Sequence, residues 1–290
     1  MTHASFSFTA PGRSGLARTG CRAAAFVASL ILVASMSGCA KLKARDLLNK
    51  GVAAFKNGQY DAAIENFKEA KDTDPTLLNA RLYLATAYAS QYIPGAPSPE
   101  NQARGNQAVT EFKEVLETNP DNLSAIDGVG SILFQMAGTP FDARKFEESK
   151  TYHQKHIGLK PEDPEPYYWI AVIDWTLAYR TNGELRLDYN KNNLKKQVKD
   201  TDALPASLRP DYISKCGTMV DEGISDLQKA IQIKPDYDDA MGYLSLLYRR
   251  KADMVEAAEE RNNLEKQADD LLDKIKEIKQ KRLEQPQSST

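Results

Sequence analysis

Two histidines have the types and spacing that could do chemistry. His153 and His156 are three positions apart in a stretch of helical spacing, so both imidazoles share one helix face and could hold a metal ion. The third histidine of the chain is His3, and no HExxH pattern flanks the pair. The two positions also match Phe67 and Ala70 of an earlier, similar segment. We therefore interpret both histidines as residues that pack between helices, and we expect no metal and no cofactor.

Other catalytic patterns are weak. Gly128-Val129-Gly130 follows no predicted strand, so it does not indicate a phosphate-binding loop. Cys216 lies on an apolar stripe within 209–235, which predicts a thiol packed in a core rather than a nucleophile. No local Ser/His/Asp signature is present. The residue pattern therefore predicts a protein that is not an enzyme.

The N-terminal segment points to a covalent modification. Residues 1–38 hold three arginines and no acidic residue, and their apolar run 23–38 is shorter than the roughly 20 residues that span a bilayer. This pattern is typical of a secretory signal. The sequence Met36-Ser37-Gly38-Cys39 resembles the bacterial lipobox, which implies a diacylglyceryl group on Cys39 and cleavage before it. An uncleaved anchor or an ordinary signal is the alternative.

The resemblance also implies a location. Ala40 follows the cysteine, which favours the outer membrane, on the side facing the periplasm, in well-studied Gram-negative bacteria. A diacylglyceryl group would attach the protein stably to the membrane, because it supplies the more than one acyl chain that a lasting anchor needs. The short tether 39–43 leads directly into the first helix, so we expect the folded part to begin near the membrane.

A repeated hairpin supplies the scaffold for these residues. Residues 44–77 read as two amphipathic helices that meet at Asn57-Gly58 and end at Asp74-Pro75. The second half of this segment, 66–75, recurs three times along the chain, at 111–120, 152–161 and 226–235. One such hairpin cannot bury its apolar face alone, so recurrence predicts a stacked, all-α solenoid.

The hairpin resembles the tetratricopeptide repeat, a helix–turn–helix unit of about 34 residues. The matching residues of the first copy are small, aromatic or helix-ending: Leu47, Gly51, Phe55, Tyr60, Ala63, Phe67, Ala70 and Pro75. The resemblance implies a right-handed superhelix of about four to five repeats over 44–252. It also implies a binding function, since this repeat serves many tasks without carrying chemistry of its own.

The later copies are longer than the first. Repeat-ending prolines are 45, 41 and 74 residues apart, and we expect the extra residues between the two helices of each hairpin, at 90–106, 135–145 and 181–208. The expected repeats are 44–77, 78–122, 123–163, 164–237 and 238–252 onward. The flanking segments are a signal peptide (1–38), a charged helix (253–284) and a disordered tail (285–290).

The charged C-terminal helix has an apolar stripe over only two heptads. Its members are spaced four and three residues apart: Leu264, Ala268, Leu271, Ile275 and Ile278. We interpret this helix as a solubilising cap over the last repeat. The alternative is a helix for self-association or for binding a partner.

The first helix of each repeat lines the inner groove in the resembled family. Three aromatic residues match one another there, four residues match near the helix starts, and two arginines lie at the far end. Together these nine form the predicted partner-binding groove: Leu48, Phe55, Leu82, Asp127, Phe134, Tyr168, Trp175, Arg249 and Arg250. The alternative is that some of them simply pack against a neighbouring repeat. A carboxylate clamp is not expected, because Leu48 and Val52 occupy its positions.

Charge excludes one class of partner. The chain has 38 basic and 40 acidic residues, and without the three leader arginines the balance is 35 against 40, or −5, which does not suggest nucleic acid. Four lysines in the long insert could meet anionic lipid or an acidic partner, or simply form a solvated loop: Lys191, Lys195, Lys196 and Lys199. The sequence thus predicts a membrane-anchored scaffold for envelope proteins or peptides. The alternative is a groove that holds a glycan or lipid.

Overall fold

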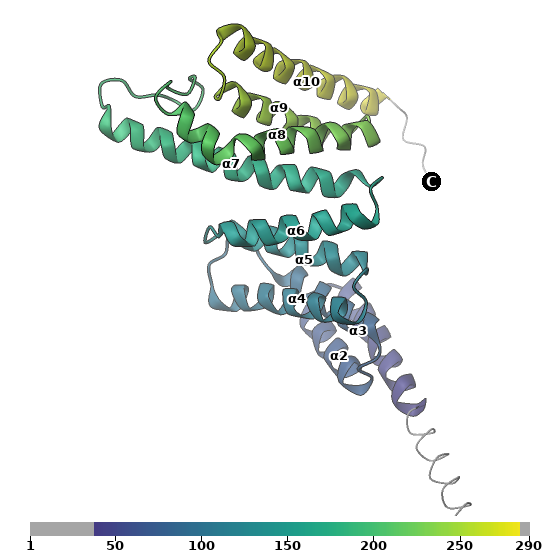
Figure 1. Ribbon diagram of the computed structural model, residues 1–290. Coiled ribbons are helices and arrows are strands. Elements are labelled where there is room, and N and C mark those ends of the chain that lie inside the picture. Colours follow the sequence, from purple (N-terminus) through teal and green to yellow (C-terminus); the bar gives the residue numbers. More distant parts are fainter. Residues whose placement is uncertain (1–37, 285–290) are drawn as a thin grey trace, which may run out of the picture. The chain divides into compact units, whose positions relative to one another are not determined.

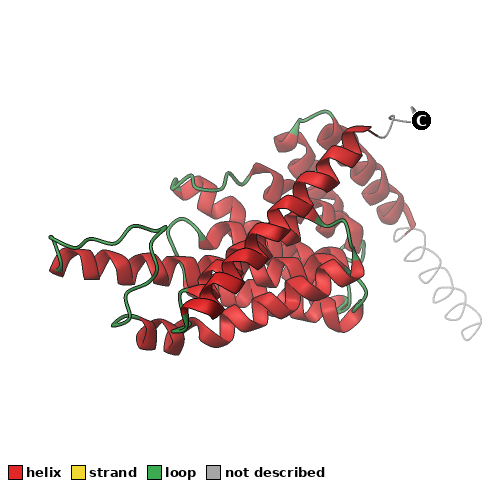
Figure 2. Cartoon of the chain, turned by 90° about the horizontal axis from the view of Figure 1, so that it is seen from above, coloured by secondary structure: helices red, strands yellow, loops and turns green. Residues whose placement is uncertain are grey.

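The computed structural model describes residues 38–284, and this part of the chain is helical throughout (Figure 1). A helix over 38–56 is followed by nine more: α2 (Tyr60–Thr73), α3 (Leu78–Gln91), α4 (Pro99–Thr118), α5 (Leu123–Ala137), α6 (Ala143–Leu159), α7 (Pro164–Asn192), α8 (Arg209–Ile233), α9 (Asp238–Ala252) and α10 (Ala258–Glu284). No strand forms within 38–284; a single β-bridge joins Gly138 and Phe141 (Figure 2). The all-α prediction is confirmed.

The chain divides into two compact units, which we describe separately. The first unit ends at Leu84 and the second begins at Ala85, inside α3.

The first unit is built around the close approach of the helix 38–56 and α2. A Cβ atom on Gly51 would lie 2.4 Å from Cε1 of Phe67, so only glycine lets the two helices come this close. Phe67 is fully buried and stacks on Tyr83, with ring centroids 5.7 Å apart. Gly58 has φ +72 at the turn between the helices, the left-handed conformation predicted there.

The second unit is a stack in which each helix packs on the next. Contacts run in chain order from α4 to α10, as a solenoid requires, and α7 also reaches α9. Four of its helices, α4 to α7, begin at side-chain caps that accept a hydrogen bond from the backbone of the first turn: Ser98, Asn122, Asp142 and Asp163. A Cβ atom on Gly128 would lie 2.5 Å from Cζ of Phe112. Gly128 therefore serves the packing of α5 on α4 and not phosphate binding.

The predicted inserts are partly helical. α4 begins at Pro99, directly after its cap Ser98, so only 92–98 connects it to α3. α7 runs for 29 residues, to Asn192, and leaves only 193–208 as an irregular connection. Added helical turns satisfy their own backbone hydrogen bonds, which a long loop cannot do when it packs against a core.

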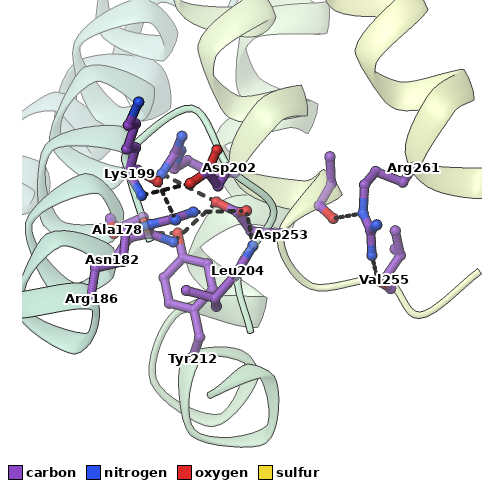
Figure 3. A network of polar contacts seen from close by, with 12 residues as sticks. Ala178, Asn182, Arg186, Lys199, Asp202, Leu204, Tyr212, Asp253, Val255 and Arg261 are labelled. Carbon is purple, nitrogen blue, oxygen red and sulfur yellow. Dashed lines mark hydrogen bonds and ion pairs between the residues drawn. The ribbon is translucent and has the colours of Figure 1, made fainter. Parts of the chain in front are cut away.

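A buried ionic network fixes the far end of α7 and the connection 193–208 (Figure 3). The Arg186 side chain donates to Asp253 Oδ1 (3.2 Å), to Asn182 Oδ1 (2.7 Å) and to the Lys199 carbonyl (2.7 Å). Asp253 also accepts from the Leu204 backbone N–H (3.1 Å) and from Asn182 Nδ2 (3.1 Å). The network, which we call the Arg186–Asp253 network, joins α7, the connection and the end of α9.

The prediction of one helix over 253–284 is wrong at its start. The chain leaves the helix after Ala252, and α10 begins only at Ala258. Asp253 turns its carboxylate into the Arg186–Asp253 network, while Met254 and Val255 are buried. These contacts hold the short bend between the two helices.

α10 lies along α9 (Figure 1). Ala268 is fully buried, and the other four stripe residues are partly buried. Ion pairs across the two helices join Arg249 to Asp269 (2.7 Å) and Arg282 to Asp238 (3.0 Å). The apolar stripe is therefore used within the chain, as expected of a cap over the last hairpin.

Candidate partner-binding surface

A continuous row of aromatic rings crosses the second unit from α5 over α7 to α9. Neighbouring ring centroids are 5.1 to 5.6 Å apart, within the range of favourable aromatic pairs. We call this row the aromatic strip; its members, in spatial order, are Phe134, Trp169, Tyr168, Tyr243, Trp175 and Tyr179. Five of them are partly buried and Tyr179 is 47% exposed, so the strip retains ring surface that solvent reaches.

Helical spacing places these rings on one face. Tyr168, Trp175 and Tyr179 are separated by seven and four positions on α7, which puts them on one side of that helix. α9 packs against α7 and inserts Tyr243 between Tyr168 and Trp175, in edge-to-face contact with both rings. Phe134, near the end of α5, extends the row through Trp169.

Neighbouring buried residues hold the strip in place. Phe146, which is 2% exposed, packs edge-on against Phe134, and the ring of Tyr237 packs against the ring of Tyr168. Burial raises the pKa of the Tyr168 and Tyr243 hydroxyls, so both are neutral phenols at physiological pH. Rigid, amphipathic rings of this kind contact a partner with little loss of conformational entropy.

The two ends of the strip differ in charge. At the α7–α9 end, the Arg250 guanidinium lies 6.0 Å from the Tyr179 ring centroid, within reach of a cation–π contact. At the α5 end, Asp127 Oδ1 lies 2.6 Å from His156 Nδ1. The strip therefore has an arginine at one end and an aspartate at the other.

The structure gathers some of the predicted groove residues and separates others. Phe134, Tyr168 and Trp175 lie in the strip, and Arg250 lies at its end. Arg249 instead pairs with a carboxylate of α10.

Asp127 lies in the second unit, on α5, and the last three predicted groove residues belong to the first unit. Leu48 packs against a small core cluster of that unit, as the packing alternative predicted. Phe55 meets Tyr60 edge-on at 5.3 Å, and Leu82 is partly buried.

Repeat matching missed three strip residues. Trp169, Tyr179 and Tyr243 have no aromatic counterpart in the first repeat, so alignment of the copies did not select them. The spacing of aromatic residues along 164–192 could have identified Tyr179, since it follows Trp175 by one helical turn.

The candidate chemical residues lie mostly in packed positions. His153 and His156 are 4% and 5% exposed, and within 38–284 no group of three or more His, Cys, Asp or Glu side chains is arranged to hold a metal. Cys216 is 2% exposed, and burial raises the pKa of its thiol. The four lysines of the long insert are exposed.

The N-terminal and C-terminal predictions fall partly outside the described residues. Residues 1–37 of the signal segment, including Met36 and Ser37, and the tail 285–290 lie outside them, whereas Gly38 and Cys39 are described and exposed. Between residues 38 and 284, no helix is long and apolar enough to cross a membrane.

Comparisons with known proteins agree with the repeat and the fold. Residues 47–77 match the tetratricopeptide repeat family. The structure resembles MamA 41-end from Desulfovibrio magneticus RS-1 (TM-score 0.54, 16% identity, covering 85% of this chain and 98% of that one). It also resembles the MamA RS-1 ArsTM double mutant (TM-score 0.55, 16% identity, 83% and 96%) and a crystal structure of MamA protein (TM-score 0.54, 16% identity, 86% and 98%). No curated protein matches the sequence. At such low identity the likeness shows the fold alone, an all-α solenoid of tetratricopeptide-type hairpins.

Proposed function

We propose that this protein is a non-enzymatic scaffold that binds protein or peptide partners along the aromatic strip while a lipid on Cys39 holds it at the bacterial cell envelope. The outer membrane, on its periplasmic side, is the proposed location. The partner is an envelope protein, and neither nucleic acid nor a cofactor takes part.

The strip is the observation that carries the binding proposal. Tyr, Trp and Arg are enriched among the residues that dominate binding energy at protein interfaces. The strip combines two tryptophans and three tyrosines with the flanking Arg250, and its rings are already ordered by their neighbours. A preorganised surface binds with a smaller entropic cost than a flexible one.

The lipobox-like sequence supports the anchoring proposal. Cys39 is exposed at the start of the described helix 38–56, where an attached lipid would not disturb a packed core. The apolar stripe of α10 faces α9 in the same chain, so we do not include self-association through that helix in the proposal.

Site-specific photo-crosslinking tests the strip directly. A benzoylphenylalanine residue at Tyr179 should trap discrete protein adducts in cells that make the full-length chain. The matched control is Leu187, which is also exposed on α7 (58%) but lies outside the strip. Equal crosslinking at both positions, or protein adducts at neither, would refute partner binding at the strip. Adducts to glycan or lipid alone would favour the small-ligand alternative.

Metabolic labelling tests the anchor. The wild-type chain should incorporate labelled palmitate and sediment with membranes, while Cys39→Ser should lose the label and become extractable without detergent. A wild-type chain that takes up no label shows that the lipid assignment is wrong. The crosslinking result stands independently of this outcome.

A further inference from the structure

A small pocket lies between α5, α6 and α7, next to the α5 end of the aromatic strip. Its volume is about 260 Å³, and its walls combine carboxylates, two imidazoles and one indole: Asp127, Ser131, His153, His156, Asp163, Glu165, Pro166 and Trp169. Pockets for whole small molecules span about 300–1,000 Å³. This one is of a size for a single side chain.

The pocket is acidic. Asp127, Asp163 and Glu165 supply three carboxylates, and none of the residues that line it is lysine or arginine. Even when His156 carries a positive charge, the walls keep two net negative charges. The Asp127 and Asp163 side chains remain 46% and 30% exposed, so both can still receive a ligand donor.

Two buried ring nitrogens of residues that line the pocket have no hydrogen-bond partner. His153 lines the pocket, is 4% exposed, and its Nε2 has no hydrogen-bond partner. His156 Nε2 lies 3.4 Å from Asp163 Oδ2 but forms no hydrogen bond with it. Burial, with a smaller effect of His156, lowers the pKa of His153 to about 4, so its ring is neutral at pH 7 and does not repel a cation.

Trp169 belongs to both the pocket and the strip. Its indole lines the pocket and lies 5.4 Å from the Phe134 ring and 5.1 Å from the Tyr168 ring. Tryptophan is the aromatic residue that binds a cation most strongly over its face. A chain that lies along the strip could therefore direct one side chain into the pocket.

We propose that the pocket binds the cationic side chain, lysine or arginine, of a peptide that lies along the aromatic strip. The proposal rests on the proposed function and specifies one residue of its partner. The carboxylates neutralise the cation, and the nearly parallel rings of Trp169 and His153 form the wall beside it. The pocket thus sets both composition and register of the bound segment.

Fluorine NMR of the full-length chain in detergent can test this, because the chain has only two tryptophans. Labelling with 5-fluorotryptophan gives one signal for Trp169 and one for Trp175, assigned with Trp175→Phe. N-acetyl-arginine and N-acetyl-lysine methylamides should shift the Trp169 signal saturably. N-acetyl-glutamine methylamide, of similar length and no charge, should not.

Charge variants provide the second arm. Asp163→Asn with Glu165→Gln should weaken binding of the arginine probe by about tenfold, since each lost ion pair contributes a few-fold. Asparagine still caps α7, so the fold is retained, and an unchanged Trp175 signal verifies this. Glu162→Gln removes one carboxylate that does not line the pocket and should leave affinity within about twofold.

Three results would overturn the pocket proposal: no saturable shift of the Trp169 signal, equal shifts by the glutamine probe, or unchanged affinity in the double variant. The proposed function would survive these results if Tyr179 still crosslinks a protein partner. Loss of the specific crosslinks at Tyr179, with cation binding intact, would refute the function but not the pocket.

Discussion

Replacement of Arg186 by methionine is a stringent test of what holds the far end of α7. Arg186 is 2% exposed and donates to a carboxylate, a side-chain amide and a backbone carbonyl. Methionine keeps most of the buried aliphatic stem but none of the donors. Removal of one member of a buried ion pair costs about 3–5 kcal/mol when its partner is left alone.

The remaining contacts of Asp253 lower that figure. The carboxylate keeps Arg250 (3.2 Å), the Leu204 N–H (3.1 Å) and Asn182 Nδ2 (3.1 Å). Lys199 is exposed, so water can replace the guanidinium at its carbonyl. We therefore expect Arg186→Met to lower the free energy of unfolding by about 2–3 kcal/mol.

Removal of the partner charge should lower the free energy of unfolding by more. Asp253→Asn removes the charge that neutralises the nearly inaccessible guanidinium of Arg186, so we expect a loss of about 3–5 kcal/mol. The double variant should be more stable than the sum of the two losses predicts, by at least about 1 kcal/mol. Urea unfolding followed by circular dichroism measures all three variants.

A local assay accompanies the global one. The lysines of 193–208 are exposed, and the Arg186–Asp253 network fixes this connection through the Lys199 carbonyl and the Leu204 N–H. Trypsin should cut there faster in Arg186→Met than in the wild type under native conditions.

The matched control is Arg180→Met. Arg180 lies on the same helix and forms an exposed ion pair with Glu184, so its replacement should cost under about 1 kcal/mol. Loss of less than 0.5 kcal/mol in Arg186→Met, roughly the size of a surface change, together with unchanged trypsin cleavage, would refute the role of the network.

Two further predictions concern packing and pH. Gly51→Ala places a Cβ 2.4 Å from the buried Phe67 ring and should destabilise the first unit by about 1–3 kcal/mol in urea unfolding, whereas Gly158→Ala, with nothing within 4 Å, should be neutral or stabilising. Equal effects of the two changes would contradict the close approach. Burial raises the pKa of Asp174 to about 7 despite its ion pair with Lys150 (2.8 Å), so the folded state takes up a proton that the unfolded state releases. The stability from this proton is present at low pH and lost as the pH rises through 7, so between pH 6 and 8 the wild type should lose about 1 kcal/mol more than Asp174→Asn. A variant that loses as much as the wild type would show that Asp174 does not titrate in this range.

The sequence predicted the helices and their stacking because both depend on local pattern. Glycine at position 51, the turn at Asn57-Gly58 and the helix-ending prolines act within one hairpin, and the copies keep the same order of packing residues before a terminal proline. The fold class could therefore be predicted from the repeats without long-range information.

The sequence-based prediction is less complete where long-range contacts decide the outcome. The proline spacing indicated extra residues over 181–208 but did not show that α7 extends to Asn192, where Asn182 and Arg186 have buried partners about 70 residues further along the chain. The prediction also joined Asp253 to the C-terminal helix. An arginine in a predicted insert and an aspartate at a helix end carry no local signal that they form a buried pair.

The candidate site divides along the same line. Repeat matching selected Phe134 and Trp175 because they occupy equivalent places in successive repeats, and it selected Tyr168 because it matches Asp127 in the same way. Trp169 joins Phe134 to Tyr168, whereas Tyr243 joins Tyr168 to Trp175 because α9 packs on α7. Matching of repeats reveals what the copies share, whereas a continuous binding surface depends on residues in which they differ.

This difference bears on how the protein would select a partner. The first repeat has Leu48 and Phe55 where the second unit has Asp127 and Phe134, so an acidic group replaces an apolar one at the same place. That acidic group lines the pocket beside Trp169, and the ring shared by pocket and strip couples the two. A partner lacking a basic residue would leave three carboxylates facing an apolar segment, with their hydration partly removed and no compensating charge. Discrimination would therefore come from the cost imposed on the wrong partner as much as from attraction to the right one.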